Sequence, residues 1–175
     1  MSRRRVLYIL VSAILAAYMG GCSNGECYDN HSALPLASFF NAATLQPVAV
    51  QALEIYGVGA PGDSVLYTPQ SISEAYLPFR IWEEETQYVF LYTSLVPEED
   101  RDDVSIIPRD TVTFRYTPKE WFVSPDCGAM YFYEMKSAEH TSVLIDSISF
   151  NTTITNENAS NIKIFFREAI NPTSQ

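Results

Sequence analysis

The chain is poor in the residues from which most catalytic and metal sites are built. It has two histidines, His31 and His140, and three cysteines in 175 residues. A catalytic triad or an imidazole metal site would depend on one of these two distant histidines. No nucleophile, base and orienting group stand together in a motif. We therefore expect no enzyme, no catalytic residue, no cofactor and no metal site.

Positive charge is also scarce. The chain has 11 Lys and Arg against 21 Asp and Glu, a formal net charge of −10. An acidic protein repels phosphate backbones, which argues against a nucleic-acid partner and against attachment to anionic lipid through a basic patch. Long apolar runs are missing after residue 22, which argues against a second membrane pass.

What the chain does have begins at its first residues. Three arginines at positions 3–5 precede an uncharged, mostly apolar stretch at 6–18, the pattern of a secretory signal peptide. Met19-Gly20-Gly21-Cys22 then resembles a bacterial lipobox, which implies lipidation of Cys22. The alternative is an ordinary cleaved signal followed by an unrelated cysteine. We expect a lipid anchor at Cys22 and a place in the cell envelope, at the outer membrane, on a side that the sequence does not specify.

Signal removal changes how the remaining cysteines are interpreted. Without residues 1–21 the chain has 154 residues and a net charge of −13, because three arginines and no acids are lost. Lipidation of Cys22 leaves Cys27 and Cys127 in an oxidising compartment, where we expect a disulfide between them. The alternative is two free thiols buried as small apolar side chains.

After a polar stretch, short apolar segments alternate with turn residues. We expect strands at 48–56, 65–67, 76–82, 88–92, 112–117, 119–123, 129–135, 143–150, 152–155 and 162–167. The strand at 88–92 is apolar on both faces and should be central. The strands at 48–56, 112–117 and 162–167 alternate apolar and polar residues, which predicts one buried and one solvated face. No capped amphipathic helix of three turns interrupts them. The fold class expected is all-β: an antiparallel β-sandwich, immunoglobulin-like or a related Greek key, of about eight to ten strands. We divide the chain into a signal peptide (1–21), a lipidated tether (22–36), a single sandwich domain (37–170) and a tail (171–175).

Several motifs of the later chain resemble an uncharacterised family of Bacteroidota lipoproteins. The likeness rests on Ser124-Pro125-Asp126-Cys127-Gly128, on Ile145-Asp146-Ser147-Ile148 and on the segment at 161–166 (Asn-Ile-Lys-Ile-Phe-Phe). The resemblance implies an exported, lipid-anchored β-sandwich, a domain of unknown function. It brings no functional residue with it, because no activity is assigned to that family.

Two features offer binding chemistry that the sequence alone leaves open. Acidic clusters at 83–85 and 98–103 supply the oxygen ligands that calcium prefers, but their spacing fits no EF-hand, so we expect solvated loops. The chain also holds 11 Tyr, 10 Phe and 2 Trp, which strands and sandwich cores favour. We expect these rings in the core, with Trp82 and Trp121 the first to test as sugar-stacking side chains.

One short pattern recurs three times. Asp, then Ser or Thr, then an aliphatic residue occurs at Ser64, Thr111 and Ser147. It resembles the O-glycosylation site of exported Bacteroidota proteins, which makes these hydroxyls candidate glycan acceptors. The alternative is purely structural, since Asp ends turns and Ser or Thr opens strands. A residue of this pattern can both open a strand and accept a glycan.

Taken as a whole, the sequence favours a non-enzymatic lipoprotein that binds or assembles with another envelope protein. The alternative function is a glycan-binding accessory. Neither the ligand nor the oligomeric state follows from the sequence.

Overall fold

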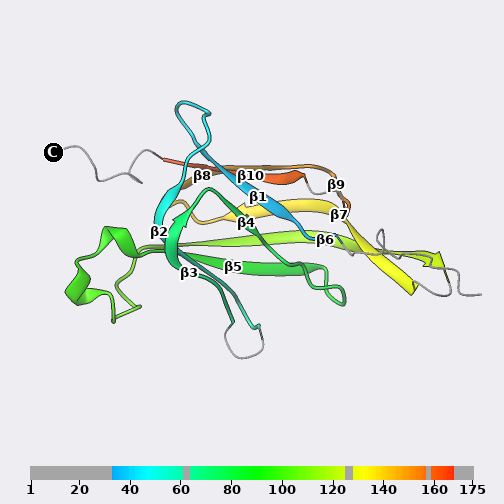
Figure 1. The fold of residues 1–175 in the computed structure, drawn as a ribbon, viewed down its shortest axis with the longest axis horizontal. Coiled ribbons are helices and arrows are strands. Elements are labelled where there is room, and N and C mark those ends of the chain that lie inside the picture. The colour runs from blue at the N-terminus through cyan, green and yellow to red at the C-terminus, as the bar shows by residue number, and fades with distance from the viewer. Residues whose placement is uncertain (1–32, 61–63, 125–127, 157–158, 168–175) are drawn as a thin grey trace, which may run out of the picture.

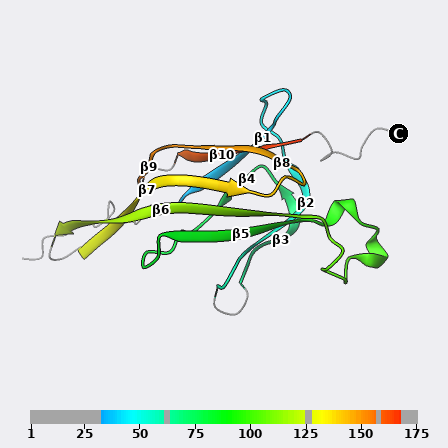
Figure 2. The ribbon, with the colours of Figure 1, turned by 180° about the vertical axis from the view of Figure 1, so that it is seen from behind.

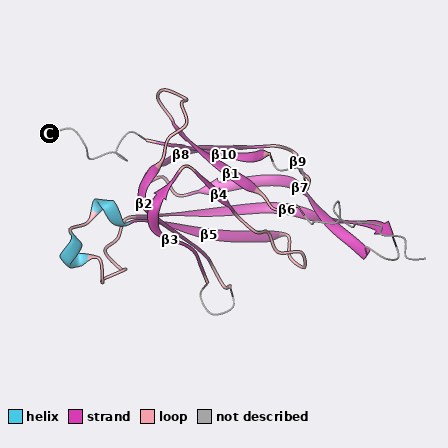
Figure 3. Cartoon of the chain, in the orientation of Figure 1, coloured by secondary structure: helices cyan, strands magenta, loops and turns pink. Residues whose placement is uncertain are grey.

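The computed structural model describes residues 33–60, 64–124, 128–156 and 159–167. Most of these residues form strands, and two short 3-10 helices, η2 (Thr93–Leu95) and η3 (Glu98–Asp100), are the only helices among them (Figure 3). No helix in the described part of the chain is long and apolar enough to cross a membrane. The strands are β1 (Leu36–Asn41), β2 (Val50–Gly57), β3 (Val65–Ile72), β4 (Glu74–Tyr76), β5 (Glu85–Tyr92), β6 (Arg109–Ser124), β7 (Gly128–His140), β8 (Ile145–Phe150), β9 (Thr153–Ile154) and β10 (Ser160–Phe166).

These strands form two sheets packed face to face (Figures 1 and 2). One has the order β4-β1-β10-β8 and the other the order β3-β2-β5-β6-β7-β9. Ten strands in two layers confirm the prediction of an all-β sandwich. One pairing departs from it, because β1 and β10 run parallel. A parallel pair needs a long connection, and the rest of the fold, lying between these two strands in sequence, supplies one.

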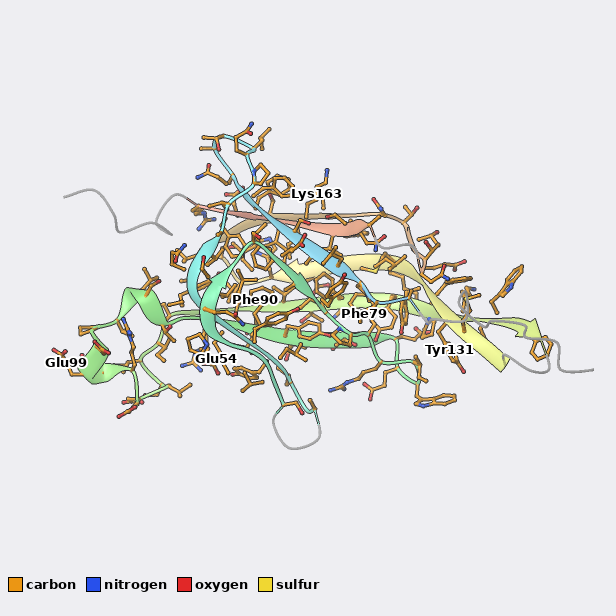
Figure 4. The ribbon with its side chains drawn as sticks, viewed as in Figure 1. Glu54, Phe79, Phe90, Glu99, Tyr131 and Lys163 are labelled. Atoms are coloured by element: carbon orange, nitrogen blue, oxygen red, sulfur yellow. The ribbon has the colours of Figure 1, made fainter. Side chains whose placement is uncertain are left out.

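Alternating side chains fill the space between the sheets. Leu53 and Ile55 of β2 are buried, and so are Val112, Phe114 and Tyr116 of β6 and Ile162, Ile164 and Phe166 of β10. Their neighbours Glu54 and Lys163 face away from this core (Figure 4). The alternation predicted for these three strands is therefore confirmed.

The strand β5 is central and buried on both faces, as expected. Its outer face carries Val89 and Leu91, which form a second apolar cluster with Ile107. Ile107 belongs to the segment at 93–108, which links β5 to β6 and includes both 3-10 helices. This segment therefore covers part of a sheet face that would otherwise be exposed.

Several strands differ from the predictions. The strand β1 was not predicted, and the segments at 112–117 and 119–123 join in the single strand β6. The prediction of a strand at 76–82 is wrong, because strand pairing ends at Tyr76 and residues 77–84 form a loop. Pro78 lacks the N–H that a ladder needs. Leu77 and Phe79 still point into the core from the loop, which explains the strand-like alternation.

Candidate binding site

Several predicted site residues lie outside the described part of the chain. They are Cys22, Cys27 and Cys127, together with His31. Lipidation and the disulfide therefore remain predictions. His140 is the last residue of β7, with Nδ1 2.7 Å from the Thr141 carbonyl.

The three candidate glycan acceptors lie in different settings. Ser64 is exposed just before β3, and Ser147 is exposed on β8. Thr111 is half-buried within β6 and lies opposite Val89 of β5. Glycosylation of these residues also remains a prediction, and the two exposed serines are the more accessible acceptors.

The two acidic clusters do not come together. Glu99, in the cluster at 98–103, lies at one end of the long axis of the molecule (Figure 4). Glu83 and Glu84 of the other cluster line a groove together with Tyr131, which lies toward the opposite end. Glu83, Glu84 and Glu85 form ion pairs with Arg80, Lys136 and Arg115, respectively. Among the described residues, no group of three or more His, Cys, Asp or Glu side chains could hold a metal ion.

The loop at 77–84 is held by the hydroxyl groups of buried tyrosines. Tyr88 donates to the Pro78 carbonyl, Tyr133 to the Phe79 carbonyl at 3.2 Å and Tyr116 to the Arg80 carbonyl at 3.0 Å. The Arg80 N–H lies 2.9 Å from the Tyr116 hydroxyl and 3.2 Å from the Thr86 hydroxyl. These contacts replace a strand ladder, so the loop is fixed although it belongs to no sheet.

Aromatic packing holds the same loop from inside. Phe79 stacks on Tyr116, with ring centroids 4.4 Å apart, and meets Tyr133 edge to face at 5.2 Å. Burial raises the pKa of Tyr133 to about 12 and also raises the pKa values of Tyr88 and Tyr116. The hydroxyls therefore stay protonated at neutral pH and can donate to the loop carbonyls.

This fixed loop presents Trp82 to solvent. The indole is 83% exposed, and its ring meets Tyr131 of β7 edge to face at 6.2 Å. Between the loop and β6–β7 runs an open groove of about 330 Å³. We call it the Trp82 groove; it is lined by Ile81, Trp82, Glu83, Glu84, Thr117, Pro118, Glu120 and Tyr131. Apolar rings and carboxylates at one hollow can bind an apolar group that carries hydrogen-bond donors.

Starting beside the groove, β6 and β7 continue past the ends of the other strands (Figures 1 and 2). We call this extension the hairpin arm; it comprises residues 119–124 and 128–132, of which Glu120 and Tyr131 also line the Trp82 groove. Trp121 is 60% exposed and Phe122 is 65% exposed. As consecutive strand residues they point to opposite faces of the arm. The expectation that the aromatic residues are buried is therefore wrong for Trp82, Trp121 and Phe122.

One carboxylate is fully buried and links the two sheets. Asp110 of β6 accepts hydrogen bonds of 2.7 Å from the hydroxyls of Tyr92 and Thr141. The N–H groups of residues 143–145, which lead into β8, donate to it at 2.8–2.9 Å. Burial tends to raise its pKa, but the hydrogen bonds from Thr141 and residues 143–145 together lower the pKa below the ordinary aspartate value. Asp110 was singled out only as part of a glycosylation pattern, and its structural role went unseen.

Sequence signals for the exposed aromatics were weak but present. Trp82 directly precedes three glutamates, and Trp121 and Phe122 are adjacent, so one sheet face cannot bury both. No comparable local signal marks Asp110, because all of its partners outside β6 are far away in the sequence.

Comparison with known proteins adds one match. A family model described as a family of unknown function (DUF6452) matches residues 52–166, from β2 to the end of β10. The match includes the Trp82 groove, the hairpin arm and Asp110. No curated protein and no solved structure matches the chain.

Proposed function

The chain belongs to this family of unknown function (DUF6452), and we propose that it is a membrane-anchored, non-enzymatic lipoprotein that binds another envelope protein through the Trp82 groove. The anchor is the lipidated Cys22, for which the support is the signal-like N-terminus and its lipobox. The family match supplies no activity. The proposal for the groove rests on the site itself.

The observation that carries the proposal is the exposure of Trp82 on a fixed loop. An indole that is 83% exposed contributes little to the core. The tyrosine hydrogen bonds hold its loop in place, so little conformational entropy is lost when a partner covers the ring. Tryptophan is among the residues that dominate binding energy at protein interfaces.

The walls of the groove define the chemistry of the partner. Ile81, Pro118 and Tyr131 supply apolar surface beside Trp82. Within the described residues Glu120 forms no ion pair, and the whole chain is acidic. The partner surface that fits best has an apolar side chain in the groove and a Lys or Arg near Glu120.

A glycan is the second candidate ligand, favoured by a specific observation. Trp82 and Tyr131 border a hollow that also contains the carboxylate of Glu120 and the hydroxyl of Thr117. Aromatic surface with hydrogen-bonding groups beside it suits a sugar ring. A bulky saccharide would need only one face of the indole and one or two of these polar groups.

The test is a comparison of wild type with Trp82→Ala. Both proteins, purified with their anchor, are used to retain partners from detergent-solubilised membranes of the native host and are applied to a glycan array. We expect wild type to retain one envelope protein in stoichiometric amounts and Trp82→Ala to reduce that retention by about tenfold or more.

The matched control is Trp121→Ala, which removes the other tryptophan and leaves the groove intact. It should retain the partner like wild type. Saccharide-dependent binding that Trp82→Ala abolishes would favour the glycan instead. Equal retention by wild type and Trp82→Ala would overturn the assignment of the groove.

A further inference from the structure

The hairpin arm exposes two large aromatic side chains where the sandwich offers them no core. Trp121 and Phe122 are each more than half exposed, and they lie on opposite faces of a two-stranded ribbon. Burial between the sheets cannot explain either ring. Exposed aromatics gathered on a projecting element mark a contact surface.

The described part of the chain begins beside this arm. The first described residue, Ala33, donates its N–H to the carbonyl of Tyr131 at 2.7 Å. The chain therefore joins the sandwich at the base of the arm. Ala33 is the eleventh residue after Cys22, and an extended chain spans at most about 3.6 Å per residue, or about 40 Å in all.

That reach exceeds the length of the arm. Six residues, 119–124, follow Pro118 to the end of β6, and a strand rises about 3.3 Å per residue. Ser124 is thus about 20 Å from Pro118 along the strand, inside the radius that the tether allows. A bilayer holding Cys22 is available to the arm at high effective concentration.

The charges on the arm indicate which kind of surface it meets. Lys119 pairs with Glu134 at 3.2 Å, and Glu120 adds a negative charge. A basic patch for anionic headgroups is therefore missing from the described part of the arm. Tryptophan and phenylalanine instead suit the boundary between headgroups and acyl chains, whatever the headgroup charge.

We propose that the hairpin arm inserts Trp121 and Phe122 into the interfacial layer of the membrane that holds the lipidated Cys22. The acyl chains supply attachment, and the arm sets the orientation of the sandwich relative to the membrane. This inference rests on the proposed anchor. It brings the Trp82 groove, which Glu120 next to Trp121 helps to line, to the membrane surface, where a membrane-embedded partner can reach it.

The chain carries its own probes, because Trp82 and Trp121 are its two tryptophans. Trp82→Phe leaves Trp121 as the reporter, and Trp121→Phe leaves Trp82 as the matched control. Both exchanges are at exposed positions and should leave folding intact. Each full lipidated protein is reconstituted into phosphatidylcholine and phosphatidylethanolamine vesicles, with or without brominated acyl chains, and vesicles are floated before tryptophan emission is recorded.

We expect brominated lipid to quench Trp121 several-fold more than Trp82, and Trp121 emission to be blue-shifted. Adding Phe122→Ser to the Trp82→Phe protein should reduce that quenching. Equally weak quenching of the two tryptophans in floated protein would overturn insertion of the arm while the anchor stands. Failure of the lipidated protein to float would overturn the anchor and the insertion together.

Discussion

Replacing Asp110 with asparagine tests how the two sheets are joined. The carboxylate accepts five hydrogen bonds, three at Oδ2 and two at Oδ1. The hydroxyls of Tyr92 and Thr141 can turn and accept from an amide, but the N–H groups of residues 143–145 cannot. An asparagine NH₂ at the Oδ1 position faces one of these N–H groups, and at the Oδ2 position it faces two.

The expected loss follows from this geometry. Even the better orientation leaves one buried N–H without an acceptor, which costs about 1–3 kcal/mol. The remaining bonds change from charge-assisted to neutral and weaken by up to about 1 kcal/mol each. Removing a buried charge offsets part of this loss. We expect Asp110→Asn to lower the free energy of unfolding by about 3 kcal/mol.

Urea unfolding followed by circular dichroism measures this loss. The matched control is Asp146→Asn, which removes an exposed carboxylate 3.4 Å from Arg167 and should cost less than about 1 kcal/mol. If Asp110→Asn costs no more than Asp146→Asn, the buried hydrogen-bond network does not hold the sheets as described.

The same carboxylate predicts a pH dependence. The pKa of Asp110 is lower in the folded protein than its ordinary value of 3.8. Its contribution to stability is therefore present above that ordinary value and is lost as the pH falls through the folded-state pKa. The stability difference between wild type and Asp110→Asn should shrink on acidification below pH 3.8. A difference that grows there would contradict the assignment.

Three further predictions address the core, the anchor and the cysteines. Ile164→Asp, at a fully buried position, should cost more than about 3 kcal/mol in urea unfolding, whereas Lys163→Asp on the outer face should be nearly neutral; equal effects would mean that the faces of β10 are wrongly assigned. Cys22→Ser should move the protein from the membrane to the soluble fraction, and its continued pelleting with membranes would place the anchor elsewhere. Cys27 and Cys127 should give no free thiol in the unreduced, denatured mature protein, and two titrating thiols would disprove the disulfide.

Much of the sandwich was predictable because its strands obey a simple alternation. Ile162, Ile164 and Phe166 face the core while Lys163 faces solvent, and this two-residue period is visible in the sequence. The central place of β5 was visible too. Its apolar residues on both faces need two covers, one of which is the opposite sheet and the other the segment at 93–108.

The loop that carries Trp82 shows why the local sequence pattern alone could not predict its backbone structure. Leu77, Phe79 and Ile81 alternate as strand residues do. The backbone carbonyls of this loop that accept from tyrosine hydroxyls of β5, β6 and β7 are nevertheless those of Pro78, Phe79 and Arg80. Only the tertiary fold brings these donors to the loop. The alternation therefore predicted a strand, and the rings that this loop and the hairpin arm expose were expected in the core.

Asp110 was missed for a related reason. An aspartate followed by a threonine and a valine is typical of a turn that opens a strand, and it also matches a glycosylation pattern. The five donors that surround its carboxylate come from residues 92, 141 and 143–145. No residue spacing in the sequence indicates that these five donors meet at the Asp110 carboxylate.

Site-specific crosslinking in the native host tests whether the Trp82 groove binds another envelope protein. A photoreactive amino acid is placed at position 82 in the Trp82 groove and, as a control, at position 163, where Lys163 is exposed on the outer face of the other sheet. We expect one discrete adduct with an envelope protein at position 82 and none at position 163, and loss of that adduct with Cys22→Ser. Absence of any adduct at position 82, or the same adducts at both positions, would contradict it.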